Sequence, residues 1–243
     1  MNPETRHTLA TDWNRAGAMF NAEESSTLPD LEQLLIRTAH AAREEPVLMP
    51  MAATWLARHG NAIAEDRLAH LIRTSLDPTD QPGMGLLLDS ARQINPRRKF
   101  SRALRQCKKS KHAHPLYADY ESDPLLIEYA RLKSSPLAKK WGLYADPIEP
   151  KHDAMRARWW VPQSHPMLQF RADCMGDLRV SIVASLLYDE GAGESELALC
   201  RASGASRTGL RDALDRLEMA GRIERTKEGR TVKIKLRNEA QYR

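Results

Sequence analysis

Residues 178–236 read LRVSIVASLLYDEGAGESELALCRASGASRTGLRDALDRLEMAGRIERTKEGRTVKIKL, and this stretch decides the fold of the C-terminal part of the chain. Most of its apolar residues recur at steps of three and four, which is typical of helices with one buried face. The helices predicted in this way span residues 178–189, 195–202 and 206–220. Residues 231–237 instead alternate apolar with basic side chains. With residues 223–226 they predict a two-stranded hairpin around a turn at residues 227–230.

Three residues mark the boundaries of the last predicted helix. Ser206 favours a helix start, because its hydroxyl can accept a hydrogen bond from a backbone N–H of the first turn. Gly204 lies in the preceding turn and can take a positive φ that a residue with a Cβ resists. Gly221 is placed to end the helix. The stretch therefore predicts two helices joined by a tight turn, with the hairpin following the second of them.

The segment from about Leu178 to Leu236 resembles the winged helix-turn-helix of bacterial transcriptional regulators. It is similar to the multiple-antibiotic-resistance and arsenic-responsive repressor families. The residues that carry the resemblance are the turn ASGAS, the helix run SRTGLRDALDRLEMAGRIER and the hairpin KEGRTVKIKL. The resemblance covers about a quarter of the chain, and the remainder resembles no family.

The resemblance implies a sequence-specific regulator of transcription that binds double-stranded DNA, expected to be a homodimeric repressor. Helix 206–220 would lie in the major groove, with Arg207 or Arg211 paired to guanine, and the hairpin would contact the neighbouring backbone or minor groove. The DNA-contacting residues expected from the resemblance are Ser206, Arg207, Thr208, Arg211, Lys227, Arg230, Lys233 and Lys235.

A second basic segment lies at residues 97–114, which hold eight basic side chains and no acidic one in a chain of net charge +5. The apolar spacing of this segment predicts an amphipathic basic helix running into a loop. Its candidate nucleic-acid contacts are Arg98, Lys99, Arg102, Arg105, Lys108 and Lys109. The same charges also fit a surface that pairs with acidic residues of this chain or of a partner, or a solvated face, so three interpretations stay open.

The N-terminal part is predicted to be a helical bundle, so the whole chain is expected to be mostly α-helical. Its predicted helices span residues 31–44, 51–59, 63–76 and 84–93, and the first begins after the capping residue Asp30. We expect three parts in the chain. They are a helical domain for dimerisation, partner binding or signal reception (1–150), a hinge (151–175) and the winged helix-turn-helix (176–243).

Several classes of protein are not expected from this sequence. No apolar run is long enough for a membrane span, and the N-terminus lacks a secretion signal, so we expect a cytoplasmic protein that associates with the nucleoid when bound to DNA. Cys107, His112 and His114 do not have the spacing of a zinc site. No nucleotide-binding loop or catalytic motif is present, so we expect neither an enzyme nor a bound cofactor.

A different class of function also fits the sequence. The N-terminal helical domain would bind another protein, as in an antitoxin or a defence-system partner, and the C-terminal domain would regulate the operon of the pair. A tight stoichiometric complex with the product of a neighbouring gene would distinguish this role from that of a free-standing repressor.

Overall fold

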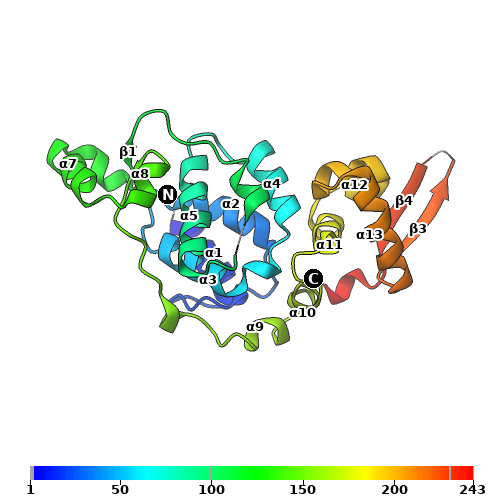
Figure 1. Cartoon of the computed structure of the whole chain (residues 1–243). Helices are drawn as coiled ribbons and strands as arrows, with labels where there is room; N and C mark the ends of the chain where they lie inside the picture. The colour runs from blue at the N-terminus through cyan, green and yellow to red at the C-terminus, as the bar shows by residue number, and fades with distance from the viewer. Residues whose placement is uncertain (1–2, 99, 230, 243) are drawn as a thin grey trace. The chain divides into compact units, whose positions relative to one another are not determined.

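The computed structural model describes residues 3–98, 100–229 and 231–242 (Figure 1). The chain divides into two compact units. The first unit is Met1–Gly60 with Leu71–Arg156, and the second unit is Asn61–His70 with Ala157–Arg243. The described residues are mostly helical, with a small antiparallel sheet near the C-terminus, as predicted. Among them, no helix has both the length and the hydrophobicity that a bilayer crossing requires.

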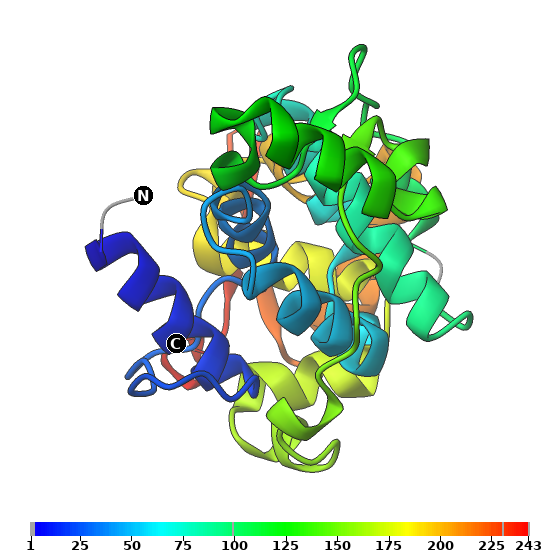
Figure 2. The same ribbon diagram turned by 90° about the vertical axis from the view of Figure 1, so that its left-hand side faces the viewer.

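The first unit consists of helices joined by connections of different lengths. Its α-helices are α1 (Pro3–Ala16), α2 (Leu31–Ala41), α3 (Leu48–His59), the C-terminal half of α4 (Glu65–Thr74), α5 (Gln81–Ile94), α6 (Ser101–Leu104), α7 (Pro124–Lys133) and α8 (Pro136–Lys140). Short 3-10 turns occur at η2 (Ala118–Ser122) and η3 (His152–Ala154), and a parallel pair is formed by β1 (His114–Pro115) and β2 (Leu143–Tyr144). A further 3-10 turn, η1 (Gly60–Ala62), begins in this unit and has its last two residues in the second unit. Helix α7 lies at the edge of this unit (Figures 1 and 2).

The core of the first unit forms where α1, α2, α3 and α5 pack together. Trp13 and Trp55 lie edge to face with their ring centroids 5.6 Å apart, and both are buried. Each indole N–H has a partner, because Trp13 donates to the Thr38 hydroxyl and Trp55 donates to the Ala16 carbonyl. Both tryptophan rings are therefore buried without leaving an indole N–H unpaired.

The four helices predicted in the N-terminal part are confirmed as α2 to α5, with ends that differ by a few residues. Asp30 caps α2 as expected, since its carboxylate accepts from the backbone N–H groups of Glu32 and Gln33. Helix α1 was not expected from the sequence. Its buried residues Leu9, Trp13 and Ala16 do follow helical spacing, within a segment that is otherwise polar.

The amphipathic helix predicted over residues 97–114 is wrong. Among the described residues of that segment, only the four of α6 are α-helical. Phe100, just before α6, has a left-handed backbone conformation with φ +47°, and its ring packs over Gly60. Arg98 is buried and its guanidinium donates to the carbonyl oxygens of Ala57 and Arg58. The chain follows these contacts with α3 instead of continuing as a helix.

The second unit combines the N-terminal half of α4 with the C-terminal part of the chain. Its other elements are α9 (Trp160–Gln163), α10 (Pro166–Cys174), α11 (Leu178–Tyr188), η4 (Ala192–Glu194), α12 (Glu196–Ser203), α13 (Arg207–Met219), β3 (Ile223–Glu228), β4 (Thr231–Leu236) and η5 (Glu239–Gln241). Helix α11 contacts α12, α13 and β4, and the core between them includes Val183, Leu199, Leu214 and Ile234. The order of three helices and a hairpin is the one that the sequence predicted.

The hairpin pairs six residues of each strand, from Ile223 opposite Leu236 to Glu228 opposite Thr231. The turn is therefore shorter than predicted and begins at Gly229, whose φ is +61°. Arg230, the expected tip contact, lies outside the described residues. After β4 and η5, Tyr242 is buried against the ring of Phe170, and its hydroxyl accepts a hydrogen bond from Arg222. Tyr242 thus packs on α10 inside this unit.

One side chain of the proposed hinge departs from expectation. The predicted hinge is rich in apolar residues around Trp159 and Trp160, a composition that favours core packing of both rings over stacking on a base. The Trp159 side chain is 64% exposed, so that prediction is wrong for Trp159. The reason is local, because Trp159 precedes the short helix α9, whose buried member is Val161.

Candidate nucleic-acid interface

The first turn of α13 presents polar side chains from a capped helix end. Ser206 is the N-cap as predicted, and its hydroxyl accepts a hydrogen bond from Gly209 N at 3.2 Å. Leu210, Ala213, Leu214 and Leu217 are buried on one face of the helix. This arrangement leaves the opposite face exposed, and with it the predicted DNA contacts Arg207, Thr208 and Arg211.

The turn before α13 is held in place by a close backbone approach. Gly204 has a φ of +70°, which confirms the expected left-handed conformation. A Cβ at this position would lie 2.4 Å from the carbonyl oxygen of Asp66, at the start of α4. The absent side chain therefore lets the turn pack directly on α4 backbone, which fixes where α13 begins.

The exposed end of α13 borders a shallow pocket of about 160 Å³ against α12. Arg207 and Arg211 line it together with Leu197 and Cys200. Arg211 Nε lies 3.5 Å from a carboxylate oxygen of Glu196, and both side chains are partly exposed, which makes this a weak surface ion pair. Glu196 was not among the site residues predicted from the sequence. Its position in the first turn of α12, the helix before α13, could have indicated a contact with the arginines of α13.

The hairpin carries its lysines in two different environments. Lys227 on β3 and Lys235 on β4 are exposed. Lys233 lies 2.9 Å from Glu228 and 3.4 Å from Glu194, and these contacts raise its pKa, chiefly through the hydrogen bond to Glu228. A polyanion approaching the hairpin would thus meet two open ammonium groups and one that is shared with carboxylates.

Acidic side chains on α13 are partly neutralised from the hairpin. Arg225 on β3 forms ion pairs with Asp215 and Glu218 in the C-terminal half of the helix. The hydrogen bond from Arg225 holds the pKa of Glu218 below its usual value. Arg225, which the sequence reading did not single out, therefore counters negative charge on the half of α13 away from the capped end.

The second predicted patch belongs to the first unit and is only partly exposed. The exposed members of the predicted set are Arg102, Arg105, Lys108 and Lys109. Arg98 was wrongly included, because its guanidinium is buried on α3 carbonyl oxygens. Lys99 lies outside the described residues. Arg97 and Lys111 are exposed as well, so the described residues of this segment keep six cations at the surface without the regular spacing of a helix.

The described residues hold no group of three or more His, Cys, Asp or Glu side chains arranged to bind a metal ion. Burial raises the pKa of Cys107 to about 12, with a smaller contribution from Asp89. The thiol is therefore neutral at physiological pH, and a neutral thiol is a weak metal ligand and a weak nucleophile.

Comparison of the chain with protein-family models, with curated proteins and with solved structures found no match. The functional argument therefore rests on the chemistry of the residues described above.

Proposed function

We propose that the second unit is a winged helix-turn-helix and that the protein is a sequence-specific DNA-binding regulator of transcription, acting as a homodimeric repressor without enzymatic activity. The observation that carries the proposal is the exposed set Arg207, Thr208 and Arg211 at the capped start of α13. A recognition helix reads base edges with these early positions. The basic hairpin that follows supplies the wing.

The exposed arginines at the start of α13 suit contact with guanine in the major groove. A guanidinium can donate two hydrogen bonds to the O6 and N7 atoms of one guanine. Arg207 is exposed, and Arg211 would have to leave only the weak contact with Glu196. Breaking a partly exposed ion pair of this kind costs less than about 1 kcal/mol, which a base contact can offset.

The hairpin and the helix end suit contact with phosphate. Lys227 and Lys235 are exposed along the two strands, where they can neutralise backbone phosphates without regard to sequence. The first backbone N–H groups of a helix also favour a negative charge nearby. Asp215 and Glu218 repel DNA less than two free carboxylates would, because Arg225 pairs with both and balances one of their two charges.

The test is selection of bound sequences from a random duplex library with the full chain, followed by affinity measurements at several salt concentrations. The proposal expects one enriched motif and an affinity that falls steeply as salt rises, because bound phosphates release their counterions. Binding with no enriched motif would remove the base-reading role of α13. If no binding to DNA were detected at low salt, the proposal would be wrong, and the second unit would be better explained as a protein-interaction module.

A second candidate function is a protein-partner role, and one observation favours a protein contact on α7. Leu125, Tyr129 and Leu132 are 78%, 48% and 71% exposed along this helix. Exposed apolar side chains that follow one helical face often mark an interface. Glu128 and Arg131 on this helix pair with each other at 2.6 Å, so the face offers a mainly apolar contact. In the homodimer proposed above, a second copy of this chain would cover it.

A further inference from the structure

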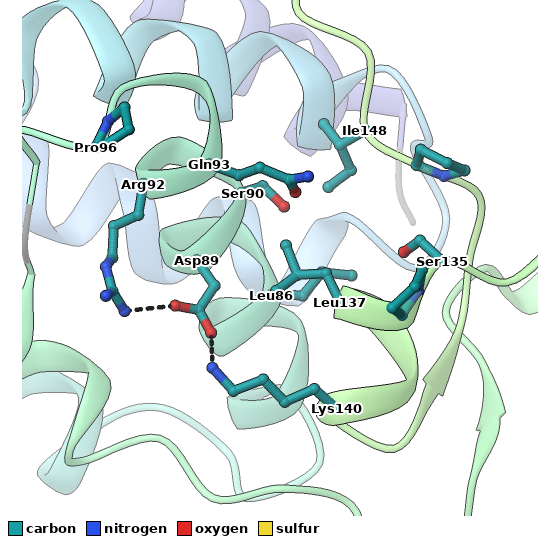
Figure 3. A pocket seen from close by; sticks show the side chains of 12 residues that line it. Leu86, Asp89, Ser90, Arg92, Gln93, Pro96, Ser135, Leu137, Lys140 and Ile148 are labelled. Atoms are coloured by element: carbon teal, nitrogen blue, oxygen red, sulfur yellow. Dashed lines mark hydrogen bonds and ion pairs between the residues drawn. The ribbon is translucent and has the colours of Figure 1, made fainter.

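A pocket of about 620 Å³ lies in the first unit between α5, α8 and the segment around Ile148 (Figure 3). This volume falls within the range of about 300–1,000 Å³ that is usual for small-molecule sites. Apolar atoms are supplied by Leu86, Leu137 and Ile148, together with proline rings. A site of this composition accepts an organic molecule with an apolar body and a small number of polar groups.

Two cations at the pocket are positioned by one buried carboxylate. Asp89, whose side chain is 4% exposed, lies 2.8 Å from Arg92 Nη1 and 2.5 Å from Lys140 Nζ. Figure 3 shows the arginine and the lysine reaching the same carboxylate from α5 and α8. Both cations remain about half exposed, at 45% and 49%. One carboxylate balances only one of the two charges, so the pocket keeps an excess of positive charge.

The carboxylate of Asp89 is itself fixed by the packing of α8 on α5. Trp141 Nε1 donates to Asp89 Oδ2 at 3.0 Å. The Trp141 ring lies so close to Gly85 that a Cβ there would be 2.4 Å from it. Because glycine allows this approach, the tryptophan, the carboxylate and the two cations are held in place before any ligand arrives.

A buried hydroxyl in the pocket lacks a partner. Ser90 is 3% exposed, and its Oγ makes no hydrogen bond with any described residue. Figure 3 shows Ser90 and Gln93 extending toward the space bordered by Leu86, Leu137 and Ile148. An unpaired buried hydroxyl costs about 1–3 kcal/mol, whereas a ligand oxygen in this space would give the hydroxyl the partner that it lacks.

We propose that this pocket binds a small organic anion, with its negatively charged group near Lys140 and Arg92 and its apolar body against Leu137 and Ile148. The excess positive charge selects for an anion, the apolar lining selects for a hydrocarbon body, and the Ser90 hydroxyl supplies one directed hydrogen bond. The site lies wholly within the first unit, so it does not depend on the DNA contacts proposed for α13.

The test is calorimetric titration of the full chain with octanoate, and with octanamide as the uncharged analogue of the same shape. We expect octanoate to bind once per chain and octanamide to bind roughly tenfold more weakly, since the amide loses the charge-assisted contact. Lys140→Met should weaken octanoate binding by a similar factor. The matched control is Lys139→Met, because Lys139 is exposed next to it and does not line the pocket.

Ser90→Ala provides a second test that does not depend on removing charge. It should weaken octanoate binding by roughly threefold or more while leaving the unliganded protein at least as stable, because the hydroxyl has no partner to lose. Three results would overturn the proposal. They are the absence of saturable binding at octanoate concentrations up to about 10 mM, equal affinity for octanoate and octanamide, and equal effects of the Lys139 and Lys140 substitutions on octanoate affinity.

Discussion

Arg67 donates two hydrogen bonds to the carboxylate of Asp189, from Nε at 2.9 Å and from Nη2 at 2.6 Å. The Arg67 side chain is fully buried, and its guanidinium also lies over the ring of Tyr188 at 5.9 Å. These two-pronged contacts join α4 to the end of α11 inside the second unit, although the two residues lie 122 positions apart. The second unit therefore depends on a segment from the first third of the chain.

We predict that Asp189→Asn lowers the free energy of unfolding by about 2–4 kcal/mol, because it removes a negative charge that pairs at two points with a buried guanidinium. Urea unfolding measures the loss, and hydrogen exchange at the amides of α11 locates it in the second unit. Glu228→Ala is the control, since it removes an exposed ion pair with Lys233 in the same unit and should cost less than about 1 kcal/mol. Equal losses in the two variants would contradict the structural role of Arg67.

The close approach at Gly204 gives a second prediction for the same unit. Gly204→Ala introduces a Cβ at a positive φ and against the Asp66 carbonyl, whereas Gly191→Ala introduces one at a similar φ with nothing within 4 Å. The strained conformation alone costs roughly 1–2 kcal/mol. We therefore expect Gly204→Ala to destabilise by about 1–3 kcal/mol more than Gly191→Ala. Thermal unfolding of both variants tests this, and similar melting temperatures would show that the turn moves away from α4 freely.

Local signals in the sequence predicted the elements that local physics determines. The caps Asp30 and Ser206 were correct, because each side chain bonds to backbone N–H groups two or three residues away. The left-handed conformation expected at Gly204 was also correct, because the tolerance of glycine for a positive φ comes from its own lack of a Cβ. The hairpin was correct except at its turn, where pairing extends to Glu228.

The contacts that the sequence did not predict join residues far apart in the chain. The sequence of a basic segment is the same whether its arginines are exposed to solvent or hydrogen-bonded to backbone carbonyl oxygens. Arg98 is buried because α3 ends beside it and offers free carbonyl oxygens. For the same reason, nothing in the sequence distinguishes Arg67 from the other residues of the helix predicted over 63–76, or marks Asp89 as a residue that lines a pocket.

Burial of Cys107 gives a prediction about thiol chemistry. Its pKa is raised to about 12 from an ordinary 9.0, so the folded protein keeps the thiol protonated at a pH where an unfolded chain ionises it. In a Cys174→Ser, Cys200→Ser background, we expect iodoacetamide to alkylate Cys107 at pH 9 on the order of a hundredfold more slowly in the folded protein than in urea. Mass spectrometry gives both rates. Comparable rates would show that the thiol is accessible and ionised at that pH.

The exposed face of α7 gives a prediction about oligomeric state. If a second copy of the chain covers this face, Leu125→Ser with Leu132→Ser should raise the dimer dissociation constant at least tenfold, because two large apolar side chains per subunit leave the interface. Sedimentation velocity over a range of concentrations measures this. Met219→Ser is the control, since Met219 is 89% exposed but lies on α13. A wild-type protein that stays monomeric at all concentrations would favour a different protein partner for α7.

The start of α13 gives the prediction that bears most directly on function. Once a preferred sequence is known, Arg207→Ala should reduce affinity for it by roughly 1–3 kcal/mol and relax selectivity at one base position, whereas Lys235→Ala should weaken binding to all sequences and reduce the salt slope by about one. Fluorescence anisotropy at fixed and varied salt separates these effects. Arg216→Ala is the matched control, because Arg216 is an exposed arginine in the last turn of the same helix and should leave affinity unchanged. If Arg207→Ala and Arg216→Ala behaved alike, the capped end of α13 would not be the part that reads DNA.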